Sequence, residues 1–168
     1  MRALLVRLFA FALCLAPVQA QQINTSPISA FTGATLAALP SNPTGTTSTS
    51  GVMMGLGSTC TITPATSTRI TVSVSGTVSN NTLNDGVFAR INTGTGVAPA
   101  NAAAISGTAR TSAQSATAYA TGANMPYSQT WVVTGLTPGT AVWIDLVFGA
   151  ITGGTASITN VNCTAAEM

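Results

Sequence analysis

The stretch of sequence that decides the fold class is Arg69-Ile70-Thr71-Val72-Ser73-Val74-Ser75-Gly76-Thr77-Val78. Apolar side chains occupy every second position along most of it, and small hydroxyl side chains occupy the positions between them. This period of two is typical of a β-strand with one face in a core and the other face in water. The run therefore predicts a half-buried strand over residues 69–78.

Strand-like runs recur along the chain, separated by clusters of Gly, Pro and Asn, which favour tight turns. The clearest runs are 87–92, 127–133, 140–148 and 155–165, and weaker runs occupy 52–54, 60–63, 103–108 and 115–120. No segment has a convincing helical period. The pattern predicts an all-β domain of roughly eight to ten short antiparallel strands, arranged as a sandwich, a jelly roll or a small barrel.

The first twenty residues differ from all that follow. Arg2 and Arg7 mark a basic start, an apolar run covers 8–16, and Val18-Gln19-Ala20 ends the segment with small residues. This order is typical of a secretory signal peptide, and the apolar run is shorter than the about 20 residues of a membrane span. We expect residues 1–20 to be removed and the chain to be exported, to the periplasm, the cell surface or the medium.

The mature chain divides by composition into two parts. Residues 21–50 contain Pro27, Pro40 and Pro43 and a tract of Thr, Ser and Gly, which indicates an extended arm or linker with room for a first edge strand. Residues 51–168 carry the strand pattern and form the predicted β domain.

The mature chain is almost free of charge. It lacks Lys and His, and its three arginines balance three acids to a net charge of zero: Arg69, Arg90 and Arg110 against Asp85, Asp145 and Glu167. A nucleic-acid partner is excluded, because binding to phosphates requires many Lys and Arg. Charge normally keeps a monomer soluble, so we expect a homo-oligomer.

The same residues argue against catalysis. Without His there is no Ser–His–Asp or Cys–His site, and three scattered carboxylates do not form the pair needed for glycoside hydrolysis. The loop from Asn80 to Asp85 offers a single carboxylate, too few for an ordinary calcium site, and is expected to be an Asn-rich turn. Asp145 is expected to face solvent or a subunit interface, paired with Arg90 or Arg110. We expect no enzyme activity, no metal and no cofactor.

Two cysteines remain after cleavage, Cys60 and Cys163. In an exported chain a pair of cysteines is most simply a disulfide, which here would close a loop of about a hundred residues and contribute about 4–5 kcal/mol in the chain-entropy model. The alternative is two buried free thiols on separate strands.

One late motif resembles known families. Leu136-Thr137-Pro138-Gly139-Thr140-Ala141-Val142-Trp143-Ile144 is similar to the turn and strand of the complement and tumour-necrosis-factor globular heads, with Thr140 where those heads usually have Asp. The same segment resembles the Leu-x-Pro-Gly turn of fibronectin-type sandwiches. Phrases such as 51–57, 94–101 and 150–157 resemble small, uncharacterised proteins encoded near phage and prophage structural genes. The first resemblance implies a jelly-roll-type β-sandwich that trimerises.

Two functions follow from these expectations. The first is a structural or adhesive module, a trimeric jelly-roll head that presents loops to a surface glycan or a protein receptor. Its expected contact residues are Asn80, Asn81, Asn84, Asp85, Asn101 and Asn124. The alternative is a monomeric carbohydrate-binding sandwich, in which an aromatic ring stacks on a sugar; the candidates are Tyr119, Tyr127, Trp131 and Trp143.

Overall fold

The computed structural model describes residues 33–117 and 120–168. Regular structure in this part of the chain is β-sheet, apart from one short 3-10 helix, η1 (Leu56–Ser58). The all-β prediction is thereby confirmed. The expected signal peptide and residues 21–32 of the expected arm lie outside the described residues. The described part contains no helix long and apolar enough to cross a membrane.

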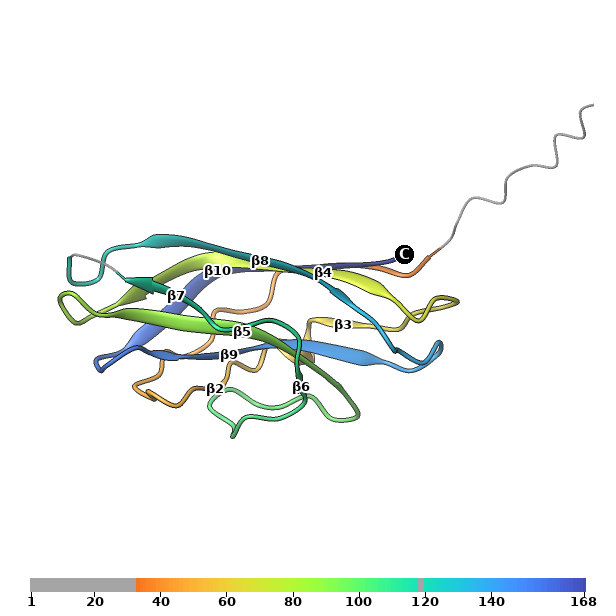
Figure 1. The fold of residues 1–168 in the computed structure, drawn as a ribbon, viewed down its shortest axis with the longest axis horizontal. Coiled ribbons are helices and arrows are strands. Elements are labelled where there is room, and N and C mark those ends of the chain that lie inside the picture. The colour runs from red at the N-terminus through yellow and green to blue at the C-terminus, as the bar shows by residue number, and fades with distance from the viewer. Residues whose placement is uncertain (1–32, 118–119) are drawn as a thin grey trace, which may run out of the picture. The chain divides into compact units, whose positions relative to one another are not determined.

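Sheet A is a four-stranded antiparallel sheet built around the alternating run (Figure 1). Its order is β1 (Thr35–Ala38), β10 (Ala156–Glu167), β4 (Ile70–Asn80) and β8 (Met125–Val133). In β4 the side chains of Ile70, Val72, Val74 and Val78 are fully buried, and those between them are partly exposed. The predicted half-buried strand is therefore confirmed, and β1 shows that an edge strand begins before residue 50.

Sheet B is also antiparallel and is centred on two long strands, β5 (Gly86–Thr95) and β9 (Val142–Ala150), which pair along their length. β2 (Val52–Met53) and β3 (Thr61–Ile62) extend the free side of β9. β6 (Thr108–Ala109) and β7 (Gln114–Thr117) extend the free side of β5. The two outer edges of sheet B are thus made of short pieces rather than full strands.

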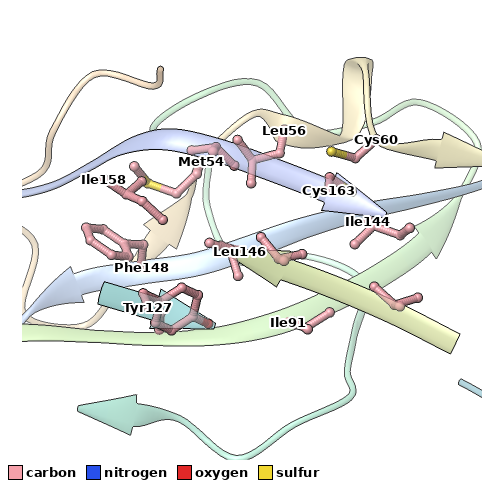
Figure 2. Close-up of a cluster of buried hydrophobic side chains, with 14 of the residues drawn as sticks. Met54, Leu56, Cys60, Ile91, Tyr127, Ile144, Leu146, Phe148, Ile158 and Cys163 are labelled. Carbon is pink, nitrogen blue, oxygen red and sulfur yellow. The ribbon is translucent and has the colours of Figure 1, made fainter. Parts of the chain in front are cut away.

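A hydrophobic core lies between the two sheets (Figure 2). β4 and β10 supply it from sheet A, and Ile91, Ile144, Leu146 and Phe148 supply it from sheet B. Burying one such aliphatic or aromatic side chain stabilises the folded state by about 1.5–3 kcal/mol, so this layered contact is the main source of stability. Two antiparallel sheets around one core make the fold β-sandwich-like.

A second, smaller apolar cluster lies on the outer face of sheet B. Met53, Trp143 and Val147 form it, with Phe88, Ala98 and Ala103 packed against them. Because this layer covers the outer face while the core covers the inner face, every residue of β9 is buried. β9 is therefore enclosed on both sides, which explains its nearly continuous apolar sequence.

Candidate binding groove

The four aromatic residues that are candidates for stacking on a sugar ring differ in their exposure to solvent. Tyr127 and Trp143 are buried, and Tyr119 lies outside the described residues. Trp131 keeps 50% of its surface exposed. Of the candidates that the structure describes, only Trp131 can therefore offer a ring face to a ligand.

The exposure of Trp131 follows from its place at a sheet edge. Its register partner on β4 is Val72, which points into the core, so alternation directs Trp131 inward as well. Inward neighbours on the same strand, Tyr127, Gln129 and Val133, are buried. β8 is the outermost strand of sheet A, and the opposite edge of sheet B consists only of β6 and β7. Opposite these short strands, half of the Trp131 surface stays exposed.

A groove of about 260 Å³ lies along this open side. One wall is the β8 segment that ends in Trp131, and the other is the chain that leads from β6 into β7. Its lining residues are Thr111, Ser112, Gln114, Ser128, Gln129, Thr130 and Trp131. Beside it, Thr130, Trp131 and Val132 border a shallower hollow. Trp131 therefore lines both depressions.

Gln129 is held firmly at the base of the groove. Its Oε1 accepts hydrogen bonds from the Tyr127 hydroxyl at 2.8 Å and from Thr111 Oγ1 at 3.1 Å. Its Nε2 donates to the Ser112 carbonyl at 3.2 Å. Burial raises the pKa of Tyr127 well above its usual range, which keeps the phenol protonated as a donor. The amide is thus pre-oriented, which reduces the entropy lost when a ligand binds.

The chemistry of the groove is neutral. Its lining consists of hydroxyl groups, two primary amides and one indole, with no ionisable side chain among them. Amides and hydroxyls can both donate and accept hydrogen bonds, and the indole adds a flat apolar face. This combination suits an uncharged ligand that carries many hydroxyl groups around apolar C–H surfaces.

Part of the expected contact loop 80–86 has a structural role instead. Asn80 is buried, and its Nδ2 donates to the carbonyls of Gly86 and Gly153. The Asp85 carboxylate accepts from the N–H groups of Gly86, Thr152 and Gly153. Burial alone would raise the pKa of Asp85, but these N–H donors outweigh it and lower the pKa. The turn is therefore tied to the neighbouring turn that follows β9.

The other expected contact residues lie mostly at the surface. Asn81 is exposed, although its Oδ1 accepts from Thr155 N, and Asn84 and Asn124 are exposed. Asn101 is exposed as a residue, but its Nδ2 donates to the Met54 carbonyl. The structure gathers none of these residues around the groove at Trp131.

The expectation for Asp145 is wrong. The side chain is fully buried on the outer face of sheet B, and its carboxylate accepts hydrogen bonds from the N–H groups of Gly55, Leu56 and Leu146. Burial raises the pKa of Asp145 to about 6, even though these donors favour the ionised form. The reason for the error is the segment around η1, which folds over this face and brings its own N–H groups.

Glu167 anchors the end of β10 in a similar way. Its carboxylate accepts from the N–H groups of Ala34, Ala65, Thr66 and Ser67. These donors lower the pKa of Glu167 to about 2. All three carboxylates of the described chain are therefore occupied by backbone N–H groups, and no three His, Cys, Asp or Glu residues of residues 33–117 and 120–168 cluster as a metal site.

Sequence comparison gives no family on which to base the groove's function. No protein-family model matches the chain, and no curated protein matches it. The geometry and chemistry of the groove are therefore the basis for its function.

Proposed function

We propose that this chain is an exported, non-catalytic binding module that holds a neutral carbohydrate in the groove beside Trp131. The observation that carries the proposal is the half-exposed indole next to two amides, one of which, Gln129, is fixed by three hydrogen bonds. A sugar ring has an apolar C–H face that can stack on the indole, and its hydroxyl groups can pair with the exposed Gln114 amide and with the hydroxyl side chains of the groove. The involvement of Asp85, Asp145 and Glu167 in backbone hydrogen bonds supports a binding rather than a catalytic role.

Binding to a panel of cello-, chito- and galacto-oligosaccharides tests the proposal. Titration calorimetry of the chain from Gln21 to Met168 should give a measurable affinity for at least one of them. Trp131→Ala should weaken that affinity at least about tenfold, equivalent to about 1.4 kcal/mol, and Trp131→Phe should retain part of it.

Val97→Ala is the control, because Val97 is an exposed apolar residue that lines neither of the two depressions at Trp131. It should leave affinity unchanged. Absence of binding to every sugar at millimolar concentration, with the chain folded, would exclude the proposal.

A second candidate function is a trimeric jelly-roll head that presents surface loops. The unpaired edge of β8 supports this candidate. This strand pairs only with β4 among the described strands, so its other side carries backbone groups without a strand partner. β8 also has no charged residue to deter another chain, and Trp131 and Val132 are exposed on it. Light scattering after size exclusion separates the candidates: a stable mass three times that of the mature chain supports the trimer, and a monomer excludes it.

A further inference from the structure

Cys60 and Cys163 come from different sheets and are both part of the core. Cys163 lies in β10 of sheet A, with Ala38 and Val74 as its register partners. Cys60 belongs to sheet B, because its carbonyl accepts a hydrogen bond from Ile144 N of β9 at 2.8 Å. Both side chains belong to the same core cluster, and Figure 2 shows them next to one another in it. Residues a hundred positions apart in sequence thus meet at one point.

The surroundings keep both thiols away from reagents. Each cysteine is fully buried and free in the structure, and Met54, Leu56 and Ile144 belong to the same core. The contact with Cys163, burial and the nearby Asp145 carboxylate all raise the pKa of the Cys60 thiol far above its usual range. Because the thiolate is the reacting species in thiol–disulfide exchange, the folded, reduced pair is expected to be inert.

We propose that Cys60 and Cys163 form a disulfide between the two sheets, and that it forms only before the sheets close over it. The oxidant is a disulfide of another molecule, such as oxidised glutathione or an exported thiol–disulfide oxidoreductase. One cysteine thiolate attacks that disulfide and releases the first partner thiolate. The second cysteine thiolate then attacks the mixed disulfide and releases the other. One S–S bond forms in this chain as one breaks in the partner, which receives two electrons and two protons.

This inference is independent of the carbohydrate proposal, because neither cysteine lines the groove. According to this proposal, the disulfide can form only before the chain has folded. A chain that folds before it meets an oxidant keeps two unreactive thiols, and a chain that is oxidised first keeps a disulfide that reductants reach only after unfolding.

The experiment uses the Cys14→Ser chain, so that alkylation reports on this pair alone. One sample is refolded with a mixture of oxidised and reduced glutathione. A second sample is refolded in the presence of a phosphine reductant. The reductant is then removed, and oxidised glutathione is added to the folded chain. Both samples are alkylated with N-ethylmaleimide in denaturant, and mass spectrometry of the intact chain counts the adducts.

We expect no adduct in the first sample and two adducts in the second. The oxidised sample should keep its disulfide in millimolar dithiothreitol until urea is added, and should unfold about 10–15 °C higher than the reduced sample. The Cys60→Ala/Cys163→Ala chain should show the same unfolding temperature after either treatment.

Two outcomes would overturn the proposal. Two adducts in the folded first sample would show that the disulfide does not form. Rapid oxidation of the already folded second sample would show that closure of the sheets does not control it. Comparing the two refolded forms of one chain avoids dependence on a variant that fails to fold.

Discussion

β8 and β9 are consecutive strands of nine residues, and each contains one tryptophan. Trp131 in β8 is 50% exposed, and Trp143 in β9 is 4% exposed. β8 has one strand neighbour among the described strands, whereas β9 lies between β5 and the β2 and β3 pieces and has apolar cover on both faces. What the neighbouring segments cover, rather than the alternation within a strand, decides whether an aromatic side chain serves the fold or stays available to a ligand.

The largest loss of stability is expected when Trp143, the buried tryptophan of β9, is truncated. Trp143 packs with Met53 and Val147, and its Nε1 donates to the Thr95 carbonyl at 3.3 Å. Trp143→Ala should lower the free energy of unfolding by about 3–5 kcal/mol, because it leaves a large cavity between packed segments. Urea unfolding followed by circular dichroism measures this loss. A loss below 1 kcal/mol would mean that the outer layer contributes little to β9.

The buried carboxylate in β9 should make stability depend on pH. Burial raises the pKa of Asp145 from 3.8 to about 6, so its ionisation opposes folding. The contribution of Asp145 to the free energy of unfolding is most favourable below pH 3.8. It declines by up to about 3 kcal/mol as the pH rises to about 6.

Glu167 acts in the opposite direction, because its lowered pKa of about 2 makes stability fall as the pH drops from 4.5 toward 2. We therefore expect maximum stability near pH 4, where the two windows overlap and the opposing slopes cancel. Asp145→Asn should remove the decline between pH 4 and 6 in urea unfolding curves while leaving the acid side intact. An unchanged slope in that variant would assign the decline to another group.

A smaller loss should follow when the packing against Trp143 is crowded. A Cβ atom at Gly94 would overlap the Trp143 ring, so Gly94→Ala should lower the free energy of unfolding by about 1–3 kcal/mol. Gly153→Ala is the control, since a Cβ there would meet no atom within 4 Å. Equal unfolding midpoints for the two variants would show that the indole can move aside without cost.

The smallest effect on stability is expected in β8. Trp131→Ala removes a side chain that is already half exposed, so the free energy of unfolding should change by no more than about 1 kcal/mol. The same variant is the one expected to lose sugar affinity, so folding and binding should separate at this position. A loss as large as that of Trp143→Ala would identify Trp131 as a core residue.

Much of the fold could be predicted from local patterns. The alternation of Ile70, Val72 and Val74 predicted β4, and the Gly and Asn clusters predicted where neighbouring strands end. These are local properties of backbone and side chain, so they are visible in sequence. The sheet to which each strand belongs depends on pairings between distant residues, which no local pattern carries.

The site was harder to predict for the same reason. Trp131 and Trp143 both lie in strand-like runs, and only the sheet order shows that one is at an edge. Asp145 was expected at a surface because a single carboxylate on a strand usually needs water, whereas here the N–H groups of Gly55 and Leu56 replace it. The segments that leave Trp131 uncovered, and the N–H groups that bind Asp145 from around η1, are distant in sequence from the residues they affect.

The order of sheet A also has a consequence for how the chain is made. β10 follows every other described strand along the chain, yet it lies between β1 and β4. From the end of β1 at Ala38 to the start of β10 at Ala156, a ribosome needs on the order of ten seconds. During that interval β1 has no partner and the centre of sheet A is vacant. Sheet A can therefore close only after β10 has been synthesised, so the sheet stays open while the 117 residues between β1 and β10 are made.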